Sequence, residues 1–194
     1  MRSDNVYELP RDLPVPQDDG ACRHLPGMRL PRLALASTGG RTVDLRALHG
    51  RTVVYCYPRT GRPDQELLPG WNEIPGARGC TPQSCAFRDH FEELKRAGAA
   101  QVFGLSTQDT AYQREAVKRL HLPFELLSDG KLAFARALKL PTFEIAGMTL
   151  IKRLALIVRD GVIEHVFYPV FPPDHNAGDV LAWLAAARRE MGSE

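Results

Sequence analysis

Short β-branched, apolar runs alternate with amphipathic segments along most of this chain, and this alternation restricts its fold more than any other feature. The clearest run, RTVVYCY at residues 51–57, ends at Pro58 and is typical of a buried strand. We expect further strands at residues 101–106, 124–128, 154–158 and 162–167, and helices at residues 80–97, 109–120, 131–138 and 177–190. Because strands and helices alternate, the sheet must be partly parallel, with helices on its faces.

Two hairpins complete the expected sheet. Gly39 and Gly40 separate two strand-like runs near the N-terminus, and residues 159–161 (Arg-Asp-Gly) join the last two strands. We therefore predict an α/β fold of the thioredoxin-like class over residues 28–191, with a central mixed sheet flanked by helices and an N-terminal β-hairpin. Residues 1–27 are rich in charge and proline, which predicts an extended arm that lies on the surface or is partly disordered.

Composition excludes several classes of protein. The 194 residues include 25 Lys and Arg against 23 Asp and Glu, and 44% are hydrophobic, as in a globular domain. The net charge of +2 gives no electrostatic case for nucleic acid, and no apolar run reaches the roughly 18 residues of a membrane span. The N-terminus lacks the apolar region of a secretory signal, so we expect a cytoplasmic protein whose four cysteines are not a permanent disulfide framework.

The most informative segment is GCTPQSCAFRD at residues 79–89. Cys80 lies at or beside the expected start of a helix, where unsatisfied N–H groups and a partial positive charge stabilise a thiolate. Thr81 and Pro82 suit such a start. Cys85 follows five residues later, which in an intact helix separates the two Cα atoms by roughly 8–9 Å. A disulfide needs about 7 Å or less, so the pair can join only if the first turns unwind.

The spacing leaves other interpretations open. Both cysteines could be small buried hydrophobic residues without chemistry. A zinc site is disfavoured, because only Cys22 and Cys56 remain as thiolate partners and no pair has the spacing of structural zinc ligands. A dithiol reductase is disfavoured too, because it would use C-x-x-C. We predict neither a metal nor a cofactor.

The segment GCTPQSCAFRDHFEELKRAGAAQVFGLSTQ resembles the active-site region of the Q-type peroxiredoxins, also called bacterioferritin-comigratory proteins. The shared features are Gly-Cys-Thr, a second cysteine five residues later, an Arg-Asp pair and a downstream Gly-x-Ser-Thr strand. The segments FELLSDGKLAFARAL and KRLALIVRDGVIEHVF extend the similarity, which runs from about residue 30 to residue 188.

The resemblance implies a thiol-dependent peroxidase that reduces hydrogen peroxide and small organic hydroperoxides. Cys80 would be the peroxidatic cysteine, Cys85 the resolving cysteine, and thioredoxin or a glutaredoxin-like dithiol the reductant. Arg153 matches the arginine that the family places near the reactive sulfur, where it would lower the thiol pKa and bind peroxide oxygens. The alternatives are a thiol–disulfide oxidoreductase and a redox-switch binding module that uses the same cysteine pair.

The sequence departs from the family at one point. The family motif Pro-x-x-x-Thr/Ser-x-x-Cys has a hydroxyl residue three positions before the peroxidatic cysteine, where this chain has Ala77. We interpret residues 61–77 as an insertion within the motif. On this interpretation Pro58 and Gly79 line the substrate site and Thr60 supplies the hydroxyl, whereas the alternative is that Thr60 is only a turn residue. The insertion either packs onto the domain or forms a contact surface.

Two cysteines lie outside the motif. Cys56 alternates with tyrosines in a core strand and is predicted to be buried and inert. Cys22 lies in the arm, where an exposed thiol could act as an alternative resolving cysteine or pair between molecules. The arm and the insertion leave a monomer or a weak homodimer as the expected state.

Overall fold

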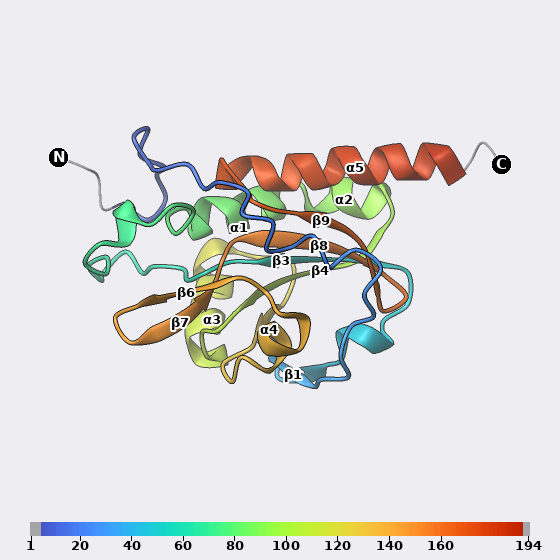
Figure 1. The fold of residues 1–194 in the computed structure, drawn as a ribbon, viewed down its shortest axis with the longest axis horizontal. Helices are drawn as coiled ribbons and strands as arrows, with labels where there is room; N and C mark the ends of the chain where they lie inside the picture. The colour runs from blue at the N-terminus through green and yellow to red at the C-terminus, as the bar shows by residue number, and fades with distance from the viewer. Residues whose placement is uncertain (1–4, 192–194) are drawn as a thin grey trace.

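A seven-stranded mixed sheet forms the centre of the computed structural model, which describes residues 5–191 (Figure 1). Its order is β2-β1-β5-β4-β3-β8-β9, and β6 pairs with β7 in a separate hairpin. The strands are β1 (Leu35–Ser37), β2 (Thr42–Val43), β3 (Arg51–Cys56), β4 (Ala99–Ser106), β5 (Leu126–Ser128), β6 (Thr142–Ile145), β7 (Met148–Ile151), β8 (Leu154–Arg159) and β9 (Val162–Phe167). Strands β3, β4 and β5 are parallel. Strand β1 pairs antiparallel with β5, β8 pairs antiparallel with β3, and β9 pairs antiparallel with β8.

Helices cover both faces of this sheet. They are α1 (Cys80–Asp89), α2 (Phe91–Arg96), α3 (Thr110–Leu120), α4 (Ala133–Leu138) and α5 (Asn176–Met191), with short 3-10 turns η1 (Leu45–Ala47), η2 (Trp71–Glu73) and η3 (Pro173–His175). Strand β3 shows why the sheet needs two covered faces. Val54 and Cys56 pack into the core that includes α4, whereas Val53 and Tyr55 pack into the core that includes α1, α2, α3 and α5.

The predicted thioredoxin-like α/β fold, with its mixed sheet and N-terminal hairpin, is confirmed. Strands β1 and β2 are antiparallel, and Gly40 takes a φ of +79° in the turn between them. The second strand of this hairpin is shorter than expected. The Asp44 side chain accepts a hydrogen bond from the Arg46 N–H, so the chain turns into η1 instead of continuing as a strand.

The long helix expected over residues 80–97 is divided at His90 into α1 and α2. His90 has φ −93° and ψ 5°, and its N–H donates to Ala86 O, which ends α1. Phe87 and Leu94 are buried on either side of the break. The apolar periodicity therefore continues across the division, and the sequence pattern alone could not reveal it.

The β6–β7 hairpin was not predicted. Its strands pair from Thr142 with Ile151 to Ile145 with Met148, and Ala146 and Gly147 form the turn with φ of +49° and +73°. A two-residue turn containing glycine between two strand-like runs is a hairpin signal that the sequence does contain. This hairpin lies next to the chain that leads into Arg153.

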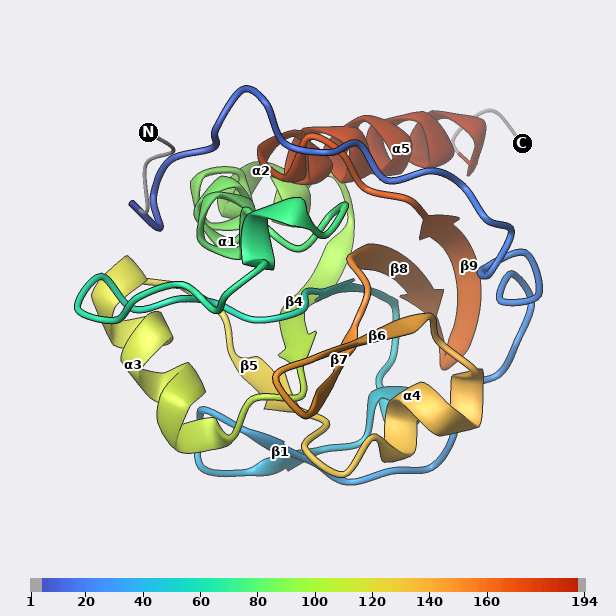
Figure 2. The ribbon, with the colours of Figure 1, turned by 60° about the vertical axis from the view of Figure 1, so that its left-hand side comes forward.

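The N-terminal arm packs onto the domain from Asn5 onward, and the first four residues of the expected 1–27 arm lie outside the described part of the chain. Figure 2 shows the arm passing over α1 and along α5 before it descends beside β9. At its end, the Gly27 N–H donates to Ile163 O at 2.8 Å and the Leu30 N–H donates to Gly161 O at 2.8 Å. None of the helices in the described residues is long and apolar enough to cross a membrane.

The interpretation of Cys22 as an exposed thiol is wrong. Cys22 is only 6% exposed and belongs to the same apolar core as Cys56, which is fully buried as predicted. Desolvation raises the pKa of the Cys22 thiol to about 12 and raises that of Cys56 well above its usual range. A thiol that is buried and protonated does not fit a second resolving or intermolecular cysteine.

Candidate active site

Cys80 is the first residue of α1, and Gly79 is the N-cap residue that precedes it. Gly79 has φ +101° and ψ 21°, a conformation that favours glycine, and its carbonyl accepts the Gln83 N–H at 3.0 Å. A Cβ atom at this position would lie 2.7 Å from Leu9 Cδ2 and 2.7 Å from Pro173 Cγ. Glycine is thus required by both backbone and packing. The helix start was predicted correctly, although Gly79 is the capping residue and not Thr81.

Arg153 lies between β7 and β8 with its guanidinium against the sulfur of Cys80. Arg153 Nη2 donates to Cys80 Sγ at 3.2 Å, to Ala77 O at 3.1 Å and to Arg78 O at 3.0 Å. Both side chains are buried, with 3% of each residue exposed. The guanidinium therefore places a positive charge and a hydrogen-bond donor directly against the buried sulfur.

Two side chains that the sequence analysis did not select fix the guanidinium. Arg153 Nη1 donates to Gln83 Oε1, and Gln83 Nε2 donates to Asn176 Oδ1 at 2.9 Å. Gln83 lies one helical turn after Cys80, and Asn176 is the first residue of α5. A glutamine at that spacing is an ordinary helix residue by sequence, so only the fold reveals its partner.

Cys85 lies on the second turn of α1 and is partly buried. All four cysteines are unpaired, and α1 is continuous from Cys80 through Cys85. Burial raises the pKa of the Cys85 thiol, and the nearby Arg88 guanidinium partly offsets the rise. The turn that carries Cys85 is held by Ser84, whose Oγ accepts from the Tyr55 hydroxyl at 3.0 Å. The pair is therefore separate in this state, as its spacing predicts.

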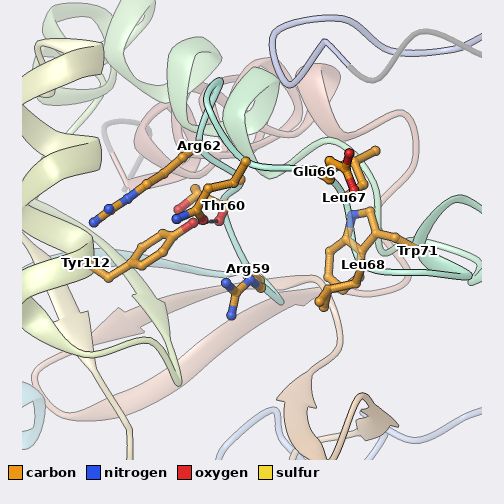
Figure 3. Close-up of a pocket in the computed structure, with 10 residues that line it drawn as sticks. Arg59, Thr60, Arg62, Glu66, Leu67, Leu68, Trp71 and Tyr112 are labelled. Carbon is orange, nitrogen blue, oxygen red and sulfur yellow. Dashed lines mark hydrogen bonds between the residues drawn. The ribbon is translucent and has the colours of Figure 1, made fainter.

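Thr60 is not a partner of the Cys80 sulfur. Thr60 Oγ1 donates to Gln108 Oε1 at 3.1 Å. The Tyr112 hydroxyl, which lies beside Thr60 in Figure 3, donates to Thr60 O at 3.1 Å. The pocket lined by Thr60 has a volume of about 40 Å³, little more than a water molecule needs. The sulfur instead donates to Ala77 O at 3.6 Å. These contacts give no support to Thr60 as the replacement hydroxyl, and Pro58 is buried at the end of β3.

A larger cavity of about 450 Å³ opens beside Arg153. Its wall is mainly apolar and comes from the arm, the end of the insertion, the β6–β7 hairpin and the chain after β9: Val15, Pro16, Gln17, Asp19, Ile74, Pro75, Gly76, Phe143, Lys152, Arg153, Tyr168, Pro169 and Val170. Arg153, which also contacts the Cys80 sulfur, is one of the residues that line this apolar cavity.

The insertion packs onto the domain. Trp71 is 5% exposed and forms a small apolar cluster with Ala77 and Leu150 of β7, and its ring centroid lies 6.2 Å from that of Phe143. Within residues 5–191, no group of three side chains suited to a metal ion is found.

A cysteine at a helix start, held by a buried arginine on a thioredoxin-like sheet, defines a thiol-redox class of site. Comparison with known proteins agrees with this class, because residues 25–181 match the Redoxin family. The chain belongs to the Redoxin family and, within it, to the Q-type peroxiredoxins.

The relatives are moderately similar. The chain is 33% identical over 159 residues to a chloroplastic peroxiredoxin Q of Oryza sativa subsp. japonica, which covers 81% of this chain and 65% of that protein. It is 30% identical over 163 residues to a chloroplastic peroxiredoxin Q of Sedum lineare, with 84% and 78% covered. A solved structure of Xanthomonas campestris peroxiredoxin Q has a TM-score of 0.63 at 25% identity, covering 82% of this chain and 96% of that chain. The chain therefore spans 65% of the length of the rice relative.

Proposed function

We propose that this protein is a thiol-dependent peroxidase in which Cys80 is oxidised by a hydroperoxide and Cys85 resolves the product. The observation that carries the proposal is the 3.2 Å contact between Arg153 Nη2 and Cys80 Sγ at the start of α1. The guanidinium and the helix N-terminus both favour the thiolate, which is the nucleophilic form of cysteine. A simple structural thiol has no need of this arrangement, and a dithiol reductase would use C-x-x-C where this chain has four residues between Cys80 and Cys85.

The first step is attack of the Cys80 thiolate on one oxygen of the hydroperoxide. The S–O bond forms as the O–O bond breaks, the sulfur becomes a sulfenic acid, and the departing alkoxide or hydroxide takes a proton to leave as alcohol or water. Arg153 stabilises negative charge first on the sulfur and then on the leaving oxygen. Gln83 holds the guanidinium in place for both stages.

The second step joins the two cysteines. The Cys85 sulfur attacks the sulfenic acid at Cys80, an S–S bond forms and water is released. Because the two Cα atoms are roughly 8–9 Å apart in an intact helix, the first turns of α1 must unwind before this step. An external dithiol, thioredoxin or a glutaredoxin-like protein, then reduces the disulfide and allows the helix to form again.

Hydrogen peroxide and small organic hydroperoxides are the proposed substrates. The cavity of about 450 Å³ supports organic hydroperoxides, because its wall is mainly apolar and Arg153 is one of its lining residues. We further propose a cytoplasmic, monomeric or weakly dimeric protein, in a compartment that supplies a dithiol. The plant relatives carry the word chloroplastic in their names, which describes those proteins.

A coupled assay tests the proposal. The protein would be mixed with thioredoxin, thioredoxin reductase, NADPH and either hydrogen peroxide or cumene hydroperoxide, and NADPH consumption followed. We expect turnover that depends on both thioredoxin and peroxide. Reduction of insulin disulfides by the protein without any peroxide turnover would instead support the thiol–disulfide oxidoreductase. Disulfide formation without recycling would support the redox-switch module.

A further inference from the structure

The N-terminal arm is hydrogen-bonded to Arg78, the residue two positions before Cys80. Residues 5–24 precede the part of the chain that matches the Redoxin family, yet Asn5 and Glu8 accept hydrogen bonds from Arg78, which is 4% exposed and also donates to Asn72 Oδ1 at 3.3 Å. Arg78 Nη2 donates to the backbone oxygen of Asn5 at 2.6 Å and to that of Glu8 at 3.5 Å. Hydrogen bonds from a buried charged donor are among the stronger ones in proteins.

Two further contacts fasten the same segment. Leu9 packs against Gly79, since a Cβ added at Gly79 would lie 2.7 Å from Leu9 Cδ2. Pro16 packs against Gly76, where an added Cβ would lie 3.6 Å from Pro16 Cβ. Figure 2 shows the arm crossing over α1 as these contacts require. The arm thus holds the chain on the N-terminal side of Cys80 at three successive points.

The same segment also orients the arginine at the sulfur. The carbonyl of Arg78 accepts from Arg153 Nη2 at 3.0 Å, beside the bond from Nη2 to Cys80 Sγ. The Arg78 side chain itself donates to the arm and to Asn72. Arg78 therefore joins the arm to the folded state of the site without taking part in the attack on peroxide.

We infer that the arm is a latch on the folded form of α1, and that Arg78 is a positioning residue that limits how fast Cys85 reaches oxidised Cys80. The inference rests on the proposed function for its chemistry. Disulfide formation requires the first turns of α1 to unwind, and this movement must release Gly79 from Leu9 and strain the Arg78 bonds. The latch acts on the equilibrium between the wound and unwound helix.

The latch decides between two fates of the Cys80 sulfenic acid. In the unwound helix, Cys85–SH and Cys80–SOH give the disulfide and water. In the wound helix, the sulfenate attacks a second hydroperoxide, so that the sulfur becomes a sulfinate and the peroxide leaves as alcohol or water. A tighter latch prolongs the second state and favours the sulfinate.

The test uses the full chain with Arg78→Met and Leu9→Ala, and with Arg11→Met as a matched control because Arg11 is an exposed arginine of the same arm. Reduced protein would receive a stoichiometric pulse of hydrogen peroxide, and disulfide closure would be followed by quenched mass spectrometry. We expect closure to accelerate roughly tenfold in Arg78→Met, because the bonds from a charged donor to Asn5 and Glu8 are lost, together with the bond to Asn72. Leu9→Ala should accelerate closure severalfold, and Arg11→Met should match the wild type.

Further readouts separate a latch from general destabilisation. The rate constant of the first oxidation should stay within about twofold of the wild type, and the sulfinate fraction at excess peroxide should fall as closure accelerates. Arg78→Lys, which keeps a buried donor, should restore most of the slower closure. Equal losses in the first oxidation and in closure would overturn the inference, because they would place Arg78 in the peroxide site.

Hydrogen exchange on the reduced protein tests the latch without peroxide. Arg78→Met and Leu9→Ala should both raise exchange in the peptide that covers residues 80–89 and leave β3 and β4 unchanged. Wild-type exchange and wild-type closure in both variants would disprove the latch. If helix exchange rises but wild-type Cys80 does not react with peroxide, the proposed peroxidase fails and the latch stands.

Discussion

Arg153 is the residue on which the chemistry of the site depends most. It is 3% exposed, and one of its nitrogens is shared among Cys80 Sγ and two backbone carbonyls. The sequence predicted this arginine only through its match to the family, since a charged residue before a strand has no distinctive pattern. Its supports, Gln83 and Asn176, come from two different helices and could not be predicted.

Replacing Arg153 should slow the first oxidation sharply. We expect Arg153→Met to lower the rate constant for reaction with hydrogen peroxide by about 10²-fold or more, because a preorganised donor at developing charge is lost. Stopped-flow fluorescence of the reduced protein measures it. Arg136→Met is the control, because Arg136 is an exposed arginine of α4. A rate within twofold of the wild type in Arg153→Met would contradict the assigned role.

The buried Cys22 makes the stability of the fold sensitive to alkaline pH. Its pKa is raised from 9.0 to about 12 by desolvation, so the folded state keeps the thiol protonated after the unfolded chain has lost the proton. The stabilisation is complete below pH 9 and is lost as pH rises toward 12. Urea unfolding at several pH values should show a shallower decline in this range for Cys22→Ala than for the wild type. Equal slopes would show that Cys22 does not contribute.

At the scale of elements, α1 carries Cys80 at its first residue and Cys85, the proposed resolving cysteine, on its second turn. The helix start and the separation of the two thiols were predictable from the order of Gly79, Cys80, Pro82 and Cys85. The division at His90 was not, because the apolar periodicity crosses it. The β6–β7 hairpin was not predicted, although Ala146 and Gly147 between two strand-like runs are a recognisable turn signal.

Gly79 links the geometry of this helix to its packing. Gly79→Ala should cost about 1–3 kcal/mol of unfolding free energy from the backbone alone, plus the cost of moving Leu9 and Pro173. Gly98→Ala is a close control, because Gly98 has φ +111° but an added Cβ there would meet nothing within 4 Å. Urea denaturation should therefore rank Gly79→Ala below Gly98→Ala in stability. The reverse order would show that the close packing at Gly79 is not maintained in solution.

At the scale of the whole molecule, the arm and the insertion complete a site that the central sheet alone leaves open. The sheet order and helix layers follow from alternating sequence patterns, which is why the fold class was predictable. The cavity beside Arg153 was not, because its wall comes from four segments distant in sequence that include Val15, Phe143 and Val170. Thr60 could not be assigned from sequence for the same reason: its partners, Gln108 and Tyr112, are about fifty residues away in the chain.

The arm should influence which hydroperoxides react. Val15 lines the cavity and is 53% exposed, so Val15→Glu should fold normally and place a charge at an apolar wall. We expect kcat/KM for cumene hydroperoxide to fall about tenfold while kcat/KM for hydrogen peroxide stays near the wild-type value. Thr142→Glu is the control, because Thr142 is an exposed neighbour of Phe143 outside this cavity. An equal change for both peroxides in Val15→Glu would show that the cavity does not receive the organic group.

The most direct measurement of the central claim is a single-turnover reaction of reduced protein with hydrogen peroxide, for the wild type, Cys80→Ser and Cys85→Ser. Intrinsic fluorescence would give the rates, and intact mass would identify the products. The account predicts a fast reaction and a disulfide in the wild type, no fast reaction in Cys80→Ser, and one oxidation that stops at the sulfenic acid in Cys85→Ser. A Cys80→Ser protein that reacts like the wild type, or a wild type no faster than a free thiol, would contradict it.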